Sequence, residues 1–390
     1  MRTIVLLGLV SFFTDLSTEM VYPLIPLYLT SAFGATPAIV GVIEGIAESL
    51  ASLLKVFSGY ISDRFQKRKA LAFFGYSTGL LYKLVLLFAG SWAGVLAARV
   101  VDRFGKGIRT APRDVLVSEN ADKAAMGKAF GIHKALDMAG SALGILLTYF
   151  LLKGRQGAFD YSNIFILSTI PALLGLCMFF FFKEPKVHHP PKPKEPFWHN
   201  AKNIDSQLKL YLLVACLFTL GNSSNSFLLL KAKDIGFGDT NVILLYFIFN
   251  MTASLLSVPF GKLSDKVGRK KLLIAGYLVF AACYAGFALA ASQLQMCLVF
   301  VLYGAYTAMV AGVERAFVAE AAPAELKGTM LGLHSTLTGI ALLPASIIAG
   351  LLWTRFGTVA PFLFGAFMSL AAVVLLAFFM RNRPAAARHL

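Results

Sequence analysis

Runs of about 20 apolar residues recur along almost the whole chain, and they limit the possible folds more than any other feature. Each run is long enough to cross a hydrocarbon layer of about 30 Å as an α-helix. Hydrophobic residues make up 57% of the 390-residue sequence and charged residues 14%, so a soluble fold would leave much apolar surface in water. The runs lack the alternating polarity of transmembrane strands. We therefore predict an all-α polytopic membrane protein.

The apolar runs predict about twelve membrane-spanning helices in two bundles. Their expected ranges are 4–31, 37–60, 70–90, 93–116, 127–152, 163–183, 208–232, 239–261, 271–291, 294–319, 328–354 and 358–380. The stretch between the sixth and seventh helices is rich in Pro, Lys and His, which is typical of an extended linker. The predicted organisation is an N-terminal six-helix bundle over 1–183, a cytoplasmic linker over 184–207 and a C-terminal six-helix bundle over 208–390.

Basic residues cluster in alternate loops, and this distribution predicts the orientation in the membrane. The rich loops are near 64–69, 123–128, 183–209, 262–271 and 381–388. By the positive-inside rule these loops are cytoplasmic, which places both termini on the cytoplasmic side of a bacterial-type inner (plasma) membrane. The same rule accounts for the formal net charge of +16 without nucleic acid as a partner. No cleavage site follows the first helix, so we expect it to be retained.

Two sequence motifs recur at nearly one offset, which indicates an internal duplication. GYISDRFQKRK begins at Gly59 and is matched 202 residues later by GKLSDKVGRKK, which begins at Gly261. GKAFGIHKAL contains His133 and is matched by GTMLGLHSTL, which contains His334, 201 residues later. These matches predict parallel repeats of about six helices each. Such repeats commonly hold a solute site near the bilayer midplane.

The first repeated motif resembles the signature loop of the major facilitator superfamily. It consists of Gly, then Asp-Arg or Asp-Lys, then a basic cluster, between predicted helices two and three and again between eight and nine. The resemblance covers the whole chain and implies two six-helix bundles that rock about a central cavity, driven by a proton or ion gradient or by the gradient of the solute. It further implies a cytoplasmic conformational latch formed by Gly59, Asp63, Arg64, Gly261, Asp265, Gly268 and Arg269.

The signature loop also has a simpler interpretation, in which its charges only set the topology. The latch is favoured because topology requires Lys and Arg but no Asp. The first copy departs from the usual family pattern at Gln66, where Gly is common.

Ionisable residues inside the predicted spans are concentrated in the N-terminal half. Insertion scales make each central charge cost roughly 2.5–3.5 kcal/mol, so such groups are expected to be paired or functional. The acidic ones are Asp15, Glu19, Glu44, Glu48, Asp102 and Asp137, and the basic ones are Lys55, Lys83, Arg99, Arg103 and Lys134. Six acids against five bases is close to balance, which predicts a paired network facing the bundle interior.

Four of these acids, Asp15, Glu19, Glu48 and Asp137, are our candidates for proton coupling or cation contact. Arg99 and Arg103 lie near the position of a basic residue in helix four that the resemblance associates with proton-coupled exporters. The sequence after them matches that family pattern only loosely, so the antiporter assignment stays open. A structural role is the alternative for the buried charges, and we favour it for Glu44 and Lys55.

The C-terminal half has fewer charges and more neutral polar groups in its spans. Its candidates for the solute cavity are Asn222, Asn225, Tyr246, Asn250, Glu314, Arg315 and His334, and His133 is the equivalent of His334 in the first half. Gly221 beside a polar run predicts an interrupted seventh helix, which acts either as a gate or only as a contact between helices. Metal ligation by the two histidines is disfavoured because further ligands at suitable spacing are missing.

Together these patterns predict a secondary active transporter that moves a small solute by alternating access. The leading hypothesis is a proton-coupled exporter of amphiphilic or drug-like compounds, or of a metabolite. The second is an importer of an organic anion held by Arg99, Arg103 and Lys83, and the third is a membrane enzyme or scaffold that translocates nothing. Phosphate-binding motifs and nucleophile–base motifs are missing from the sequence, so neither a cofactor nor catalysis is expected. The expected partners are the solute, protons and the lipid bilayer, and two internal halves favour a functional monomer.

Overall fold

The regular structure of the chain consists of helices. The computed structural model describes residues 2–65, 67–120, 126–153, 161–182, 206–321 and 327–379. Within these ranges every regular element is a helix, and eleven stretches are long and apolar enough to cross a membrane. The charged residues of α5 (Trp92–Glu119) keep that helix out of the eleven. The predicted all-α polytopic fold with about twelve spans is thus confirmed.

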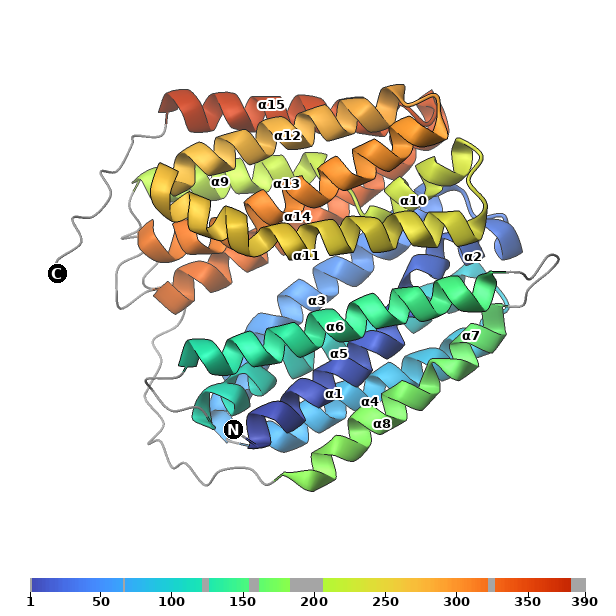
Figure 1. Cartoon of the computed structure of the whole chain (residues 1–390), viewed down its shortest axis with the longest axis vertical. Coiled ribbons are helices and arrows are strands. Elements are labelled where there is room, and N and C mark those ends of the chain that lie inside the picture. The colour runs from blue at the N-terminus through green and yellow to red at the C-terminus, as the bar shows by residue number, and fades with distance from the viewer. Residues whose placement is uncertain are drawn as a thin grey trace. The chain divides into compact units, whose positions relative to one another are not determined.

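The helix ends agree with the predicted ranges to within six residues. The first half contains α1 (Arg2–Glu19), η1 (Tyr22–Leu24), α2 (Ile25–Phe33), α3 (Pro37–Phe65), α4 (Arg68–Leu87), α5, α6 (Met126–Leu152), α7 (Tyr161–Leu167), α8 (Thr169–Cys177) and η3 (Met178–Phe181). The second half contains α9 (Ser206–Gly221), α10 (Asn225–Asp234), α11 (Asp239–Val267), α12 (Arg269–Leu289), α13 (Gln293–Ala321), α14 (Lys327–Phe356) and α15 (Ala360–Phe379) (Figure 1).

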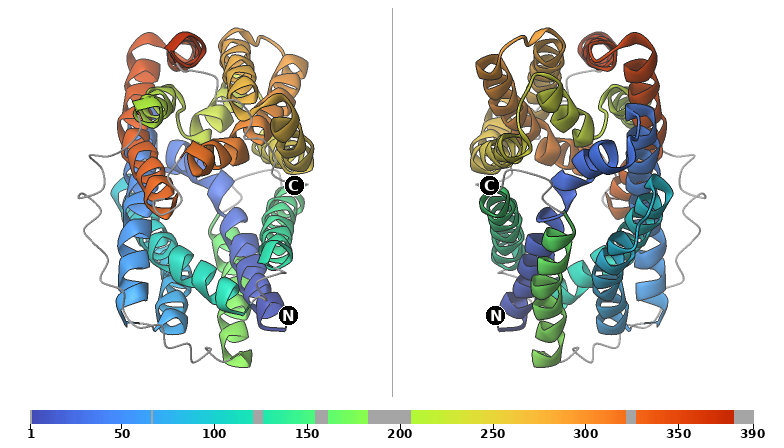
Figure 2. Two further views of the ribbon diagram at one scale, coloured as in Figure 1. Left: turned by 90° about the vertical axis from the view of Figure 1, so that its left-hand side faces the viewer. Right: turned by 90° about the vertical axis from the view of Figure 1, so that its right-hand side faces the viewer.

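The helices group into two compact units. Unit 1 comprises Met1–Lys192 with Phe237–Phe247, and unit 2 comprises Pro193–Gly236 with Ile248–Leu390. In unit 1, α1 packs against α6 and α8, and α5 packs against α3 and α4 (Figure 2). In unit 2, α12 packs against α13 and α15, and α9 packs against α14 and α15. Of the linker predicted at 184–207, only the last two residues are described, and they begin α9.

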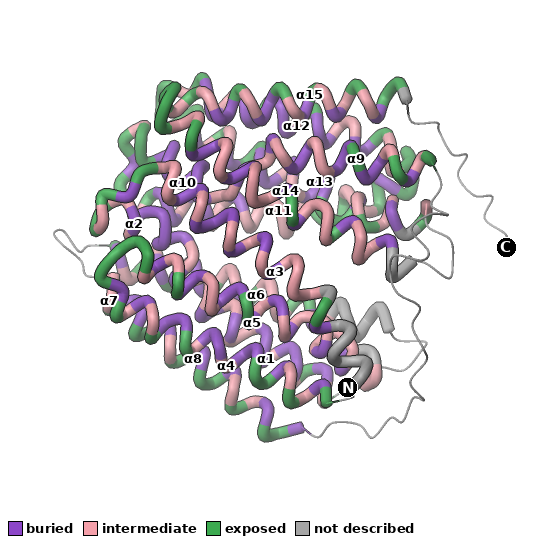
Figure 3. The backbone as a smooth tube through the Cα atoms, turned by 180° about the vertical axis from the view of Figure 1, so that it is seen from behind, coloured by how far each residue is buried: buried purple, intermediate pink, exposed green. Residues whose placement is uncertain are grey.

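Many large apolar side chains are exposed on the helices, whereas several charged side chains are buried. Phe378 is 80% exposed and Phe88 is 86% exposed, while Arg99 is completely buried and Lys83 is 1% exposed. Buried and exposed positions occur on the same helices throughout both units (Figure 3). This distribution is the reverse of that in a soluble protein, and it is the one that a lipid solvent favours.

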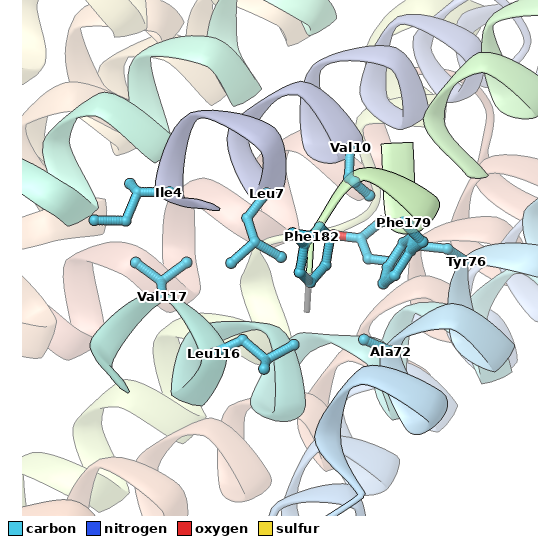
Figure 4. Close-up of a cluster of buried hydrophobic side chains, with 9 residues drawn as sticks. All are labelled: Ile4, Leu7, Val10, Ala72, Tyr76, Leu116, Val117, Phe179 and Phe182. Carbon is cyan, nitrogen blue, oxygen red and sulfur yellow. The ribbon is translucent and has the colours of Figure 1, made fainter. Parts of the chain in front are cut away.

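A cluster of buried apolar residues joins α1, α4, α5 and the end of the sixth span. Its members are Ile4, Leu7, Val10, Ala72, Tyr76, Leu116, Val117, Phe179 and Phe182 (Figure 4). Because lipid tails are as apolar as these side chains, close packing contributes more to their association than exclusion from water does. The cluster fixes the start of α1 against α4 and α5.

Two spans are interrupted at equivalent positions of the two halves. In the first, α1 ends at Glu19 and Pro23 lies in η1, where the missing proline N–H prevents a continuous helix. In the second, α9 ends at Gly221, and Ser224 caps α10 by accepting a hydrogen bond from the Ser226 backbone N–H at 3.3 Å. The interruption expected beside Gly221 is present, and Pro23 accounts for the other one.

Candidate functional site

Arg99 is the centre of a buried ion network between α3 and α5. Its guanidinium donates two hydrogen bonds to Glu44, from Nη2 to Oε2 at 2.9 Å and from Nε to Oε1 at 3.1 Å. Asp102, one turn further along α5, accepts from Nη1 at 3.3 Å. The side chains of Arg99 and Glu44 are both 0% exposed. The two carboxylates neutralise the guanidinium, and a solute has no exposed surface by which to reach it.

Arg103 extends this network to Glu48, a carboxylate that is more exposed than the others. Its Nη2 lies 2.9 Å from Glu48 Oε1, and its Nε lies 3.6 Å from Asp102 Oδ2. The Glu48 side chain is 31% exposed, so the network is accessible at this end. Tyr22, from the interruption after α1, places its ring 5.2 Å from the Arg99 guanidinium and 5.7 Å from that of Arg103. The interruption therefore covers the network with an aromatic face, which favours both cations.

Asp15 of α1 and Asp137 of α6 lie near each other, across the contact between these two helices. Two neighbouring ionised carboxylates repel each other, and a proton on one of them removes that repulsion. Lys134 also donates to Asp137 Oδ2, at 2.6 Å, from the exposed side of α6. The pair can therefore hold one proton between two helices.

Glycines bring these two carboxyl groups together. Gly140 and Gly144 lie one turn apart on α6, against the backbone carbonyl oxygens of Phe12 and Leu16 on α1. A Cβ atom at either glycine would overlap with the facing carbonyl oxygen. Small residues at such spacing allow close approach of helices in membranes. The sequence therefore determines locally that α1 and α6 touch at Phe12 and Leu16, which flank Asp15, and at two glycines that follow Asp137.

Glu19 lies one turn beyond Asp15 and is half-buried. Its Oε2 atom is buried without a hydrogen-bond partner among the residues that the structure describes. Tyr246 lies near the Glu19 side chain, and the Tyr246 ring centroid is 5.9 Å from that of Tyr22. Tyr246 is in the part of α11 that belongs to unit 1, whereas Asn250, one turn further on, belongs to unit 2. The structure thus places two predicted residues, Glu19 and Tyr246, near each other.

In unit 2, neutral hydrogen bonds surround the interruption between α9 and α10. Three polar side chains at the interruption each meet a tyrosine hydroxyl of α12 or α13. The pairs are Asn222 with Tyr306 at 3.2 Å, Ser223 with Tyr284 at 3.3 Å and Asn225 with Tyr303 at 3.1 Å. These tyrosines were not predicted from the sequence. Their spacing contains a signal, because positions 303 and 306 share one face of a helix.

The two predicted histidines have different surroundings. His133 Nε2 lies 2.9 Å from Ser11 Oγ, which lies 3.2 Å from the Tyr76 hydroxyl. His334 Nε2 lies 4.0 Å from Glu314 Oε2 in unit 2. The neighbouring Arg315 is exposed. Among the described residues, no group of three or more His, Cys, Asp or Glu side chains is placed to hold a metal ion.

The second signature loop forms an ion pair between spans. Gly268 adopts φ 93°, a left-handed conformation that favours glycine, and precedes the first residue of α12. That residue, Arg269, lies 2.7 Å from Glu320 of α13 and 3.7 Å from Asp265. Gly261 has open space around it.

The first signature loop has the corresponding ion pair. Arg68 of α4 contacts Glu119 of α5, and each lies 201 residues before its counterpart in the second half. Glu119 and Glu320 were not among the latch residues predicted from the sequence. Of the predicted latch residues Gly59, Asp63 and Arg64, the structure describes only the helical backbone.

A family model described as Major Facilitator Superfamily matches residues 7–229 and 210–390, which together span almost the whole chain. The chain belongs to the Major Facilitator Superfamily. It is 37% identical to the uncharacterized MFS-type transporter MJ1317 of Methanocaldococcus jannaschii over 97% of this chain and 94% of that protein. It is 23% identical to the multidrug resistance protein MdtG of Salmonella paratyphi C, over 71% of this chain and 70% of that one.

A solved structure agrees with this membership at the level of the fold. The crystal structure of a D-xylose–proton symporter superposes with a TM-score of 0.79 at 16% identity, covering 98% of both chains. The resemblance that the signature loops suggested is therefore confirmed. This member of the Major Facilitator Superfamily is an integral membrane transporter.

Proposed function

We propose that the protein is a proton-coupled secondary transporter that exports a small amphiphilic solute by alternating access. The observation that carries the proposal is the carboxyl pair of Asp15 and Asp137. With one proton bound the pair carries a single negative charge, and loss of that proton leaves two like charges near each other inside the bundle. The contact between α1 and α6 therefore depends on proton occupancy.

The size of this dependence is sufficient for coupling. Two unit charges about 4 Å apart repel by roughly 4 kcal/mol at an effective dielectric constant of 20. An energy of this size shifts a two-state equilibrium by almost three orders of magnitude, since about 1.4 kcal/mol corresponds to a factor of ten. Proton binding at the pair can thus favour one arrangement of the helices over another, which is the requirement for coupling a proton gradient to solute movement.

Two observations support an exported solute that is not a simple anion. The relative MdtG is named a multidrug resistance protein, and unit 2 presents neutral tyrosine and asparagine groups around its interruption. The imported-anion hypothesis is less well supported by the geometry. Arg99 and Arg103 are already paired with carboxylates, and Lys83 is buried and donates to the Gly79 carbonyl oxygen at 3.0 Å. Membership of a transporter family also favours translocation over the enzyme or scaffold hypothesis.

We also propose an orientation in the membrane and a cytoplasmic latch. The basic loops favour both termini on the cytoplasmic side of an inner membrane, and the internal duplication favours a functional monomer. We further propose that the two signature loops, with Glu119 and Glu320 as the acidic partners of Arg68 and Arg269, act as the cytoplasmic latch.

Transport in reconstituted vesicles tests the proton coupling. A thermal-shift screen of ethidium, Hoechst 33342, norfloxacin and a metabolite panel at two pH values would first find a binder, which stabilises the folded protein by mass action. An imposed pH gradient should then drive accumulation of that binder by the wild-type protein. The double variant Asp15→Asn with Asp137→Asn should keep downhill exchange but lose accumulation. Ser141→Ala, on the same helix, is the control and should behave as wild type.

Accumulation that ignores the pH gradient in the wild-type protein would refute proton coupling. The same conclusion would follow if the double variant accumulated the binder as well as the control does.

A further inference from the structure

Glu314 differs from the other carboxylates that the structure describes in unit 2. Asp234 pairs with Lys231 at 3.0 Å, and Asp265 and Glu320 both pair with Arg269. Among the described residues, no Lys or Arg lies within 4.0 Å of the Glu314 carboxylate. Its partners are the Tyr277 hydroxyl, which donates to Oε1 at 2.7 Å, and His334. The carboxylate is largely buried, with 17% of the side chain exposed.

Four helices contribute titratable groups around this carboxylate. They are Tyr211 from α9, Tyr277 from α12, Tyr306 and Arg315 from α13 itself, and His334 from α14. Arg315 is exposed, whereas Tyr211 and Tyr277 are completely buried. The Tyr211 hydroxyl and His334 Nε2 are buried without hydrogen-bond partners among the described residues. A buried polar atom without a partner is costly, so its persistence beside a carboxylate requires a reason.

We propose that Glu314 and His334 together bind one proton, at a site in unit 2 that is separate from Asp15 and Asp137. With the proton on Glu314, the neutral carboxyl accepts from Tyr277 and can donate to His334 Nε2. With the proton on His334, an imidazolium faces a carboxylate. The Nε2–Oε2 distance of 4.0 Å is about 1 Å longer than a hydrogen bond, so a small side-chain rotation suffices for transfer.

The first half contains the equivalent tyrosine and histidine but no carboxylate at the position of Glu314. Tyr76 and His133 lie 201 residues before Tyr277 and His334, and the Ser11 hydroxyl bridges them at 3.2 and 2.9 Å. The position equivalent to Glu314 is Arg113, whose guanidinium pairs with Asp114 at 2.9 Å. The tyrosine and histidine are thus common to both halves, and the carboxylate is specific to the second.

This inference goes beyond the proposed function and does not rest on it, because the two carboxyl sites lie in different units. It adds a second proton-binding group, so a complete transport cycle has two places at which a proton can be held. A transporter that used only Asp15 and Asp137 for coupling would still contain the Glu314 site.

Infrared difference spectroscopy of the full chain in lipid nanodiscs tests the site with the proton as the only ligand. Spectra taken between pH 5 and pH 9 reveal protonated carboxyl groups by their carbonyl stretching band. The wild-type protein should show a band that Glu314→Gln removes. His334→Gln should retain the band but shift its midpoint by about one pH unit or more, equivalent to a tenfold change in proton affinity. His133→Gln, the matched histidine of the first half, should leave the band and its midpoint unchanged.

Several results would overturn the proposal. One is a set of carboxyl bands that is the same in Glu314→Gln and the wild-type protein. Another is a midpoint that moves equally in His133→Gln and His334→Gln. If Glu314→Gln fails to fold, Tyr277→Phe takes its place, and an unchanged midpoint in both Tyr277→Phe and His334→Gln would refute the site. The variant Asp15→Asn with Asp137→Asn should keep the Glu314 band, so failure of the proposed function is distinguishable from failure of this inference.

Discussion

Arg99 shows how a guanidinium is kept inside a protein whose surroundings are lipid. Its Nε and Nη2 donate to Glu44 and its Nη1 donates to Asp102, so all three nitrogens face carboxylate oxygens. Removing one partner from such a group leaves an uncompensated charge in a medium of low dielectric constant. The energy at risk is therefore the desolvation of the remaining arginine, which is larger than the energy of one hydrogen bond.

We predict that Glu44→Gln lowers the free energy of unfolding by about 3–5 kcal/mol, because Arg99 stays buried with only Asp102 as its acid. Unfolding by SDS in mixed micelles measures this difference. Glu320→Gln is the control, since its carboxylate is 47% exposed and pairs at the surface, where such pairs contribute at most about 1 kcal/mol. Equal losses in the two variants would contradict the prediction.

The chemistry of the buried charges was predictable from the sequence, but their pairing was not. Near balance between acids and bases predicted a paired network, and the structure pairs Arg99 with Glu44 and Arg103 with Glu48. The contact of Asp15 with Asp137 was missed, because it depends on how closely α1 approaches α6. Residue types determine which charges need partners, whereas helix rotation and separation determine which partners they meet.

At the scale of the helical element, contact between α1 and α6 depends on two glycines. Gly140 and Gly144 leave no space for a side chain between α6 and the carbonyl oxygens of α1. A helix pair this close gains van der Waals contacts along its whole length, which is the main source of helix association in lipid. The carboxyl pair exists because these contacts determine the separation.

We predict that Gly144→Ala destabilises the protein by about 1–3 kcal/mol, as overpacking does elsewhere, and weakens the contact of Asp15 with Asp137. Denaturant titration measures the first effect, and loss of accumulation driven by a pH gradient measures the second. Gly79→Ala is the matched control in α4, because its added Cβ would lie 3.9 Å from the nearest neighbouring atom, Arg109 Nη1. A Gly144→Ala protein as stable and active as Gly79→Ala would show that the helices can separate without consequence.

Helix positions were the most predictable part of the fold, since each apolar run is one span. Gly221 also marked one of the two interrupted spans and Pro23 explains the other, because each weakens a helix by a known local mechanism. The tyrosines that meet Asn222 and Asn225 were not found, since they come from helices far away in the sequence. Local chemistry predicts where a helix breaks, and only packing shows what meets the break.

At the scale of the whole molecule, the duplication repeats one ion pair in both halves. Arg68 with Glu119 and Arg269 with Glu320 occupy equivalent positions. Their environments differ, however. The first pair is buried, with 7% and 9% of the two side chains exposed, and the second is 26% and 47% exposed. Because water screens exposed charges, the first pair contributes more to any latch.

We predict that Glu119→Gln increases accessibility from the cytoplasm more than Glu320→Gln does, and that the double variant exceeds either. A coupling of 1–3 kcal/mol, typical of such switches, corresponds to about a 5- to 150-fold shift in population. Labelling of single cysteines from each side of the membrane measures the population open to each compartment. Equal effects of the two single variants, or none in the double variant, would exclude a latch at these pairs.

The duplication was visible in the sequence because two motifs kept the same spacing, and those motifs alone were sufficient to indicate the family. The solute could not be predicted in the same way. Its recognition depends on side chains drawn from several helices, such as Asn225 with Tyr303, and no local pattern connects them.

The interruptions of the first and seventh spans also show that one joint can be made in two ways. One is made by Pro23 and the other by a serine cap at Ser224, yet they lie about one repeat length apart. Each half therefore has a jointed leading span, although a different local chemistry produces it.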